Sequence, residues 1–351
     1  MRLLCARPEP VSILGPFWPK PEQTTPYMLN RRHLRVKILE TLYAHHSDAH
    51  PDARKVMVDI DASVQSMKVC YLLSLRLLAE IVRFTNQWAD QREAKMMMAV
   101  RRIHENRRFA AHPYPSDLER LERYRQAEVS YRLRGYPLPD TDQMTMLFKE
   151  VVALEAYQNY INLPEQFPLE DYNLLHVIYK EILLPNEMID AYFEEISIHW
   201  ETDKEWIAAA VIKTLKEGSR VGGLRLVDMS RDWPSDLSFC SNIVQEVCDR
   251  AELTDARIKP YLKSWDLERV AFIDLLILRM ALAEMVMEQQ IPVKVTLNEY
   301  LELAKSHSTP KSSIFVNGVL DALSKNLQAE GIIVKSGRGL ITQSTTNVRN
   351  S

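Results

Sequence analysis

The sequence has few of the residues and patterns that several protein classes require. Only 9 of its 351 residues are glycine, well below the average share of roughly 7%, so the tight turns of β architectures are scarce. Its four cysteines show no C-x-x-C spacing, which indicates buried or inert thiols in a reducing cytoplasm. No apolar run approaches the roughly 20 residues that a membrane-spanning helix needs. We therefore expect a cytoplasmic protein without a membrane anchor.

Good helix formers dominate the composition instead: Leu, Ala, Glu, Lys, Arg and Met. Hydrophobic residues make up 46% and charged residues 26% of the chain, which is ordinary for a soluble globular protein. The sequence therefore predicts an all-α fold. A net charge of −3 does not by itself indicate a polyanion-binding protein, but a whole-chain average can hide local patches.

Prolines and glycines divide the chain into segments. Residues 1–27 are proline-rich and aperiodic, which predicts a disordered extension. A first helix is predicted within 28–46, and a helical region interrupted by prolines follows over 47–235. Residues 217–223, with three glycines, are predicted to form a loop. A compact run of helices over 236–330 and a flexible tail over 331–351 complete the prediction.

Charge is unevenly distributed within the middle region. Residues 76–134 contain 13 Arg and Lys against 8 Asp and Glu, whereas residues 140–205 contain 3 Lys against 15 Asp and Glu. Two oppositely charged, solvated faces that attract one another would explain this pattern. A basic nucleic-acid surface beside an acidic partner-binding face would also explain it. We favour the first interpretation, because charged helix faces are usually solvated.

The start of the first helix is rich in arginine. Its apolar stripe recurs at helical spacing: Leu34, Ile38 and Leu42. Three arginines lie at its N-terminal end: Arg31, Arg32 and Arg35. The helix macrodipole disfavours cations there, so a phosphate that also bonds the free first-turn N–H groups would fit. Weak ion pairs with acidic neighbours would also fit, and this segment alone leaves both interpretations open.

Residues 265–290 are apolar almost all round, which predicts the buried centre of a helical bundle. Asp274 and Arg279 interrupt this pattern. Because buried charges need partners, each is either satisfied within the chain or lies at an edge. In the alternative, functional interpretation, Asp274 faces a partner protein and Arg279 faces RNA. For Arg279 we favour satisfaction within the chain.

Two further helix starts follow. Thr296 and Glu299 fit a capping box, and Thr309-Pro310 fits an N-cap followed by proline at the first helical position. In the last helix the predicted core stripe is Val316, Val319, Leu320, Leu323 and Leu327. Phe315 lies on its flank beside Lys311 and Asn317, where it can stack an unpaired base or pack at the core edge. Gly318 costs about 1 kcal/mol relative to alanine, which is tolerable if another helix approaches closely.

Together these segments resemble the NusB family. The motifs, in order, are R-R-x-x-R-x-x-x-x-x-x-L-Y, I-D-x-x-I-L-R-x-A-x-x-E-M, I-P-x-K-V-x-x-N-E-x-x-E-L-A-K and F-V-N-G-V-L-D, within residues 28–46 and 236–327. The resemblance implies two small packed helical bundles and transcription antitermination on RNA polymerase. It implies binding of single-stranded boxA RNA of ribosomal RNA leaders together with NusE, a ribosomal small-subunit protein. It implies no catalytic site, cofactor, metal or small-molecule substrate.

The resemblance also assigns residues. The RNA-binding start is matched by Arg31, Arg32 and Arg35, and by resemblance further RNA contacts are expected at Tyr43, Arg279 and Phe315. Lys311 and Asn317 are expected to bind RNA because their polar groups lie beside Phe315 and can bond the edges of a stacked base. Asp274 matches an acidic position at the NusE face. The chain departs from the family at His33, where an additional arginine is common and which could make RNA binding pH-sensitive. At Lys311 it has a basic residue where the family often has an acidic one. It also contains an insertion of about 180 residues.

Three alternatives remain. A NusB-like domain also precedes ribosomal RNA cytosine methyltransferases, but we expect no such enzyme because only 24 residues follow Leu327. A helical protein–protein scaffold that has lost RNA binding would act through its acidic insertion. A metal site at His45, His46 and His50 is conceivable, although solvated histidines are the more common explanation and no carboxylate or cysteine set completes it.

Overall fold

The computed structural model describes residues 28–46, 51–95, 108–163, 168–221, 223–262, 270–337 and 340. Regular structure within these ranges is helical, apart from an isolated bridge residue at Asp228, whose carbonyl accepts a hydrogen bond from the Met28 N–H at 2.8 Å. The predicted all-α fold class is confirmed. The extension predicted for residues 1–27 lies outside the described residues.

The described residues form two compact units. Unit 1 contains Leu29–Ala62 and the chain from Asp232 onward, and unit 2 contains Met28 and Ser63–Arg231. The boundary falls inside helix α2 (Ala53–Lys95). The first turns of α2 therefore belong to unit 1, although the sequence pattern had placed them in the region 47–235.

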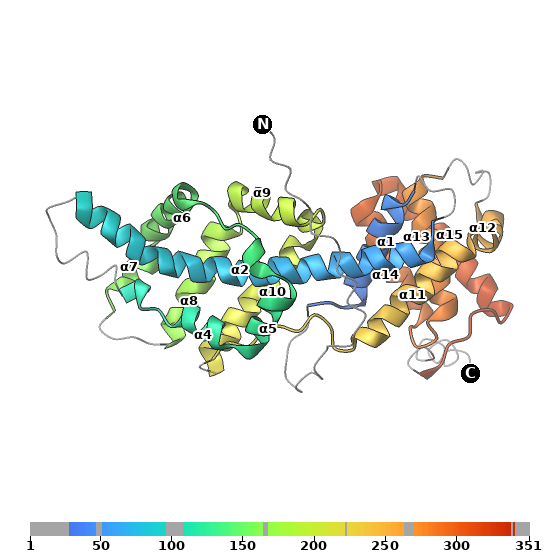
Figure 1. Cartoon of the computed structure of the whole chain (residues 1–351). Coiled ribbons are helices and arrows are strands. Elements are labelled where there is room, and N and C mark those ends of the chain that lie inside the picture. The colour runs from blue at the N-terminus through green and yellow to red at the C-terminus, as the bar shows by residue number, and fades with distance from the viewer. Residues whose placement is uncertain are drawn as a thin grey trace, which may run out of the picture. The chain divides into compact units, whose positions relative to one another are not determined.

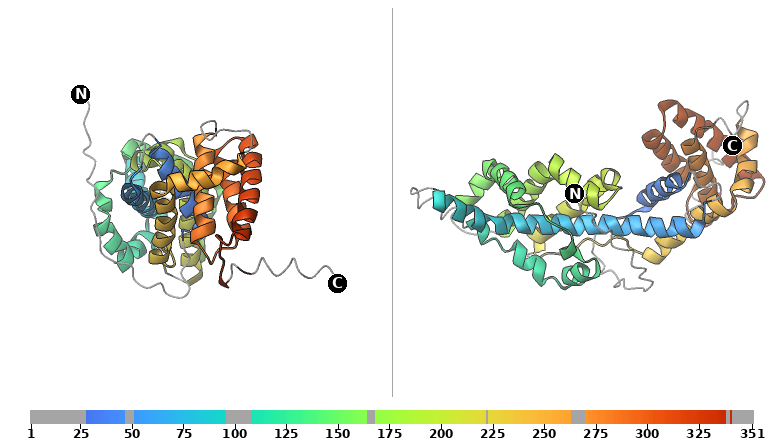
Figure 2. Two further views of the ribbon diagram at one scale, coloured as in Figure 1. Left: turned by 90° about the vertical axis from the view of Figure 1, so that its right-hand side faces the viewer. Right: turned by 45° about the horizontal axis from the view of Figure 1, so that its top comes forward.

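Unit 1 is built around helix α13 (Phe272–Met287) (Figure 1, Figure 2). Nearly every residue of α13 from Asp274 to Met285 is buried, as its continuous apolar sequence predicts. The other helices of unit 1, besides the start of α2, are α1 (Arg31–Ala44), α11 (Trp233–Asp249), α12 (Ala251–Ile258), η3 (Lys259–Tyr261), α14 (Val293–His307) and α15 (Pro310–Ala329). Helices α1, α11, α12, α14 and α15 all contact α13.

The segment after α15 is packed rather than free. Gly331 adopts a φ of +71°, and the N–H groups of Gly331 and Ile332 donate to the carbonyls of Gln328 and Leu327, which is a Schellman C-cap. The chain turns back, so that Ile333 is buried and the Ser336 N–H donates to the Gln289 carbonyl at 3.0 Å. The predicted flexible tail 331–351 is therefore wrong for residues 331–337, and residues 341–351 lie outside the described residues.

Unit 2 contains the remainder of α2 and a series of shorter helices. These are α4 (Tyr114–Arg120), α5 (Glu122–Ser130), η1 (Leu133–Gly135), α6 (Thr141–Ala153), α7 (Glu155–Ile161), α8 (Pro168–Ile178), the π-helical turn η2 (Tyr179–Leu183), α9 (Glu187–Ile196) and α10 (Trp200–Val221). Among these shorter helices, α8 and α10 pack against each other.

Helix α10 continues through Gly218, where the glycine-rich sequence predicts a loop. A Cβ at Gly218 would lie 2.6 Å from Cε1 of Tyr172. Glycine is therefore required here for the close packing of α10 against the Tyr172 ring, rather than for a turn.

Candidate nucleic-acid interface

The N-terminus of α1 is capped by its own residues. The Asn30 Oδ1 accepts hydrogen bonds from the N–H groups of Arg32 (2.9 Å) and His33 (3.2 Å). The His33 Nδ1 accepts one from the Asn30 N–H at 3.0 Å. One of the two interpretations of the sequence carried the expectation that a phosphate bonds the free first-turn N–H groups. That expectation is corrected, because Asn30 already occupies those of Arg32 and His33.

Arg35 is enclosed in unit 1. Its Nε and Nη2 donate to the two carboxylate oxygens of Glu284 at 2.7 Å each, and the two side chains are 3% and 0% exposed. Glu284 also accepts hydrogen bonds from the hydroxyls of Thr296 (2.9 Å) and Tyr300 (3.2 Å). The Arg35 guanidinium, which was expected to contact RNA, is therefore closed to a phosphate in this structure.

Thr296 and Glu299 do not form the predicted capping box. Helix α14 begins at Val293, so both residues lie inside it. Thr296 is directed to Glu284, and Glu299 binds arginines of α1. Both side chains therefore serve the contact between α14 and its neighbours.

Arg32 is held by Glu299 but remains accessible. Its Nε and Nη2 donate to the two Glu299 oxygens at 2.8 Å each, and its side chain is 53% exposed. The hydrogen bond from Arg32 is the largest cause that lowers the pKa of the Glu299 carboxyl below its usual value. This guanidinium can reach a solvent-borne anion if it leaves the carboxylate.

Arg31 lies against an aromatic ring. Its guanidinium carbon is 4.2 Å from the centroid of the Phe239 ring. Its nitrogen atoms lie 3.6 Å from Asp236 and 3.7 Å from Glu288, and its side chain is 35% exposed. These separations exceed ordinary hydrogen-bond lengths, so Arg31 is bound less tightly by carboxylates than Arg32 and Arg35 are.

An exposed aromatic cluster lies at the other end of α1. The Tyr43 ring stacks on His46 with centroids 5.4 Å apart, and Phe272 of α13 lies 6.0 Å from Tyr43 and 5.9 Å from His46. Tyr43 and Phe272 are both among the exposed large hydrophobic residues. We call Tyr43, His46 and Phe272 the aromatic cluster.

Of this cluster, only Tyr43 was identified from the sequence. His46 was considered solely as a metal ligand, and Phe272 directly precedes a motif that was assigned to the bundle core. Arg32 and Tyr43 are eleven residues apart, so they lie almost on one azimuth of α1, about 16 Å apart along its axis. Arg32 and the aromatic cluster are therefore exposed at the two ends of α1 on nearly the same side, and the residues between them are buried or half-buried.

Asp274 and Arg279 of α13 differ in their surroundings. The Arg279 Nε and Nη2 donate to the two oxygens of Asp255 at 2.7 Å each. This ion pair within the chain is the arrangement that we favoured for Arg279 over a contact with RNA. Asp274 is only 4% exposed, and its Oδ1 has no hydrogen-bond partner within the described ranges. Such a buried acceptor is costly unless a donor reaches it.

Helix α15 presents the remaining predicted RNA-binding residues. Its core stripe is buried as predicted: Val316, Val319, Leu320, Leu323 and Leu327. Lys311 and Asn317 are exposed, and Phe315 is half-buried. A Cβ at Gly318 would meet nothing within 4 Å. The expected close approach of another helix at Gly318 is therefore not made by the described part of this chain.

The histidines near the end of α1 are engaged in other contacts. The His45 Nε2 lies 2.8 Å from an Asp59 carboxylate oxygen, and His46 belongs to the aromatic cluster. His50, the third residue of the metal site considered above, lies outside the described residues. No group of three or more potential metal ligands occurs among the residues that the structure describes.

Arginines of residues 76–134 form ion pairs within unit 2. Three of them pair with acidic residues of the same stretch: Arg83 with Glu80 and Glu119, Arg125 with Glu122, and Arg134 with Glu128. Arg123 pairs with Asp228. These ion pairs do not involve the acidic residues of 140–205, so they do not support the expected mutual attraction of the two stretches.

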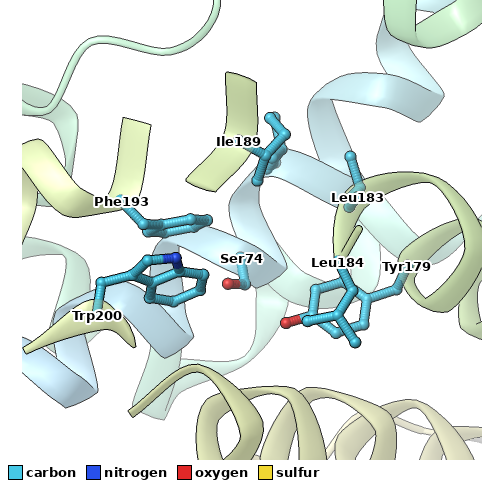
Figure 3. A pocket seen from close by; sticks show the side chains of 8 residues that line it. Ser74, Tyr179, Leu183, Leu184, Ile189, Phe193 and Trp200 are labelled. Atoms are coloured by element: carbon cyan, nitrogen blue, oxygen red, sulfur yellow. The ribbon is translucent and has the colours of Figure 1, made fainter. Parts of the chain in front are cut away.

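A pocket in unit 2 offers little chemistry. It is lined by Ser74, Leu77, Tyr179, Leu183, Leu184, Ile189, Phe193 and Trp200 (Figure 3). The rings of Phe193 and Trp200 stack at 4.3 Å, and the Ser74 hydroxyl donates to the Cys70 carbonyl at 2.9 Å. Burial raises the pKa of the Tyr179 hydroxyl above its usual value. The lining therefore supplies packing surface rather than an acid–base pair.

Part of this chain resembles known proteins in sequence. The model of the NusB family matches residues 227–325. The transcription antitermination protein NusB of Salinibacter ruber is 36% identical over 147 residues, which cover 40% of this chain and 91% of that protein. The NusB protein of Chloroherpeton thalassium is 42% identical over 103 residues, 29% of this chain and 49% of that protein.

A third relative gives the same result. The NusB protein of Thermodesulfovibrio yellowstonii is 38% identical over 88 residues, which cover 25% of this chain and 58% of that protein. No solved structure matches the chain significantly. Among the described helices, none combines the length and apolar character needed to cross a membrane.

Proposed function

The chain belongs to the NusB family, and we propose that it is a transcription antitermination factor that binds single-stranded boxA-like RNA together with NusE. The observation that carries this proposal is the exposure of Arg32 at one end of α1 and of the aromatic cluster at the other. Arginine suits phosphate, and aromatic rings suit unpaired bases. The proposal requires no catalytic step and no cofactor, and it places the action of the protein in the cytoplasm.

We select the proposed RNA contacts by the exposure of their side chains to solvent. The side chains of Arg31 and Arg32 are 35% and 53% exposed, with Nη1 of Arg31 buried, and Lys311 and Asn317 are exposed on α15. These side chains, with the aromatic cluster and Phe315, form the proposed RNA surface. Arg35 and Arg279 support it from within, because each is held in a bidentate ion pair.

Asp274 is the proposed NusE contact. Its buried Oδ1 lacks a hydrogen-bond partner in the described part of unit 1, and a donor from a partner protein would satisfy it. The acidic residues of unit 2 would suit a different role, as the interface of a protein scaffold without RNA binding. The exposed guanidinium of Arg32 favours the RNA-binding function over this second candidate.

The decisive experiment is an anisotropy titration of a labelled boxA-like RNA from the same organism, with and without its NusE protein. Binding that becomes tight only when both proteins are present supports antitermination. Absence of RNA binding in both titrations would leave the scaffold function as the better explanation. An Asp274→Asn variant should lose the enhancement by NusE while keeping the weaker binding of the protein alone.

A further inference from the structure

Glu299 stands between two arginines of α1. It binds Arg32 through two hydrogen bonds of 2.8 Å, and the Arg35 Nη1 lies 3.5 Å from its Oε2. The Glu299 side chain is 18% exposed, so one side of it meets solvent and the other meets Arg35, which is buried. Glu299 is thus shared between an accessible arginine and an inaccessible one.

The bidentate pair occupies the part of Arg32 that a phosphate needs. A guanidinium presents its N–H groups as a planar fork, and this fork matches carboxylate and phosphate in the same bidentate manner. In the structure the Nε and Nη2 edge faces Glu299. A phosphate therefore has to compete with Glu299 for the same donors.

Release of Arg32 would not leave Glu299 without a cation. Arg35 is fixed nearby by its own bidentate bond to Glu284, and its Nη1 already lies within ion-pair distance of Glu299. The pair that would be lost is half-exposed on the arginine side, and such pairs contribute little free energy. The exchange of Arg32 from carboxylate to phosphate therefore costs little stability.

We propose that Glu299 is a positioning residue that holds Arg32 in the free protein and yields it to a phosphate of single-stranded RNA. The inference rests on the proposed RNA-binding function. Glu299 thereby lowers the affinity of the protein for RNA, because every RNA that binds has to displace this carboxylate. An RNA strand that makes several contacts at once overcomes the competition, whereas an isolated phosphate does not.

The test compares Glu299→Gln with Glu302→Gln as a matched control. Glu302 lies one turn further along α14 and pairs with Lys305 at 2.7 Å rather than with an arginine of α1. We expect Glu299→Gln to tighten binding of the labelled boxA-like RNA by about two- to fivefold, the range of an exposed ion pair. The Glu302→Gln variant should change it less.

Two further variants separate a specific release of Arg32 from a general loss of negative charge. In an Arg32→Ala background, Glu299→Gln should give no further gain, since no arginine is left to release. Glu299→Asp keeps the charge but shortens the side chain, so it should weaken the bidentate pair and tighten RNA binding by an intermediate amount. A similar gain with and without Arg32 would overturn the proposal.

Thermal melting of each variant is measured in parallel, and the comparison uses only variants that melt as the wild type does. If Glu299→Gln melts early, Glu299→Asp and its double variant with Arg32→Ala carry the test. Unchanged or weaker RNA binding by a folded variant would also overturn the proposal.

If Arg32→Ala binds RNA as tightly as the wild type, the RNA surface itself is wrong. If Arg32→Ala weakens binding but removal of the Glu299 charge does not tighten it, only the role of Glu299 fails.

Discussion

Arg35 and Glu284 form an ion pair that is closed to solvent and joins α1 to α13. The hydroxyls of Thr296 and Tyr300 bond the same carboxylate from α14. One buried charge pair therefore connects three helices of unit 1. The family resemblance placed Arg35 among the RNA contacts, but its surroundings give it a structural task.

Replacement of Arg35 by leucine should destabilise the protein by about 3–5 kcal/mol, because the Glu284 carboxylate would stay buried without its cation. Urea unfolding followed by circular dichroism measures this loss. The Arg32→Ala variant is the control, since it removes an exposed pair and should cost about 1 kcal/mol or less. Equal losses for the two variants would contradict the structural role of Arg35.

The two glycines inside α10 and α15 should respond oppositely to alanine. At Gly218 the added Cβ meets the Tyr172 ring at 2.6 Å, so Gly218→Ala should destabilise the protein by about 1–3 kcal/mol through overpacking. At Gly318 the Cβ meets nothing within 4 Å, so Gly318→Ala should stabilise it by up to about 1 kcal/mol. Unfolding midpoints in urea give both signs, and a stabilising Gly218→Ala would refute the close packing.

Acid should weaken unit 2 through His112. Its Nδ1 accepts a hydrogen bond from the Tyr114 N–H, and its Nε2 bonds the Asp171 carbonyl. Burial lowers the pKa of His112 below its usual value, because the enclosed site disfavours the imidazolium. The unfolded chain therefore binds the proton more readily, so the stability is complete above about pH 6.5 and declines as the pH falls below it.

The pH dependence is measured as the urea midpoint between about pH 7.5 and about pH 5.5, either side of the ordinary histidine pKa. Asparagine at position 112 keeps an acceptor two residues before the Tyr114 N–H but cannot take up a proton in this range. The His112→Asn variant should therefore lose stability less steeply with acid than the wild type. Parallel curves for the two proteins would remove His112 as the cause.

The packed segment after α15 should contribute to stability. Ile333 is buried, so Ile333→Ala should cost about 2 kcal/mol or more. The neighbouring Val334 is 57% exposed, and Val334→Ala should change stability by no more than about 0.5 kcal/mol. Hydrogen exchange offers a second measurement, since the Ser336 amide should be protected by its bond to Gln289. Rapid exchange there, with a neutral Ile333→Ala, would contradict the packing.

Stacking and phosphate contacts should leave different signatures in RNA binding. Phe272→Ala should weaken binding by about 1–3 kcal/mol at every salt concentration, the range for one stacked base. Arg32→Ala should instead reduce the slope of log affinity against log salt by about one unit, because one phosphate contact is lost. Titrations over a series of salt concentrations distinguish the two. A Phe272→Ala variant that changes only the slope would argue against base stacking.

Patterns among residues close in sequence were sufficient to predict core residues and helix starts of unit 1. The apolar periodicity correctly identified Leu34, Ile38 and Leu42 as buried, and the N-cap at Thr309 was predicted from its immediate neighbours. The continuous apolar sequence of α13 correctly predicted its central position. These features depend on neighbours along the chain, which a sequence displays directly.

The candidate site depended on partners that are remote in sequence. Arg32 and Arg35 pair with Glu299 and Glu284, which lie 267 and 249 residues away, and no periodicity connects such positions. The capping-box pattern at Thr296 was misleading for the same reason, since Thr296 and Glu299 are directed to other helices. His46 and Phe272 form one cluster only because α1 and α13 pack together.

The unit boundary inside α2 determines where the chain can be shortened without removing core residues of unit 1. The helix contains neither glycine nor proline from Ala53 to Lys95, and its turns up to Ala62 belong to unit 1. Val56 and Ile60 in those turns are fully buried. A shortened chain that skips from residue 46 to residue 236 would therefore discard Val56 and Ile60, whereas one that joins Ala62 to Asp232 would retain them.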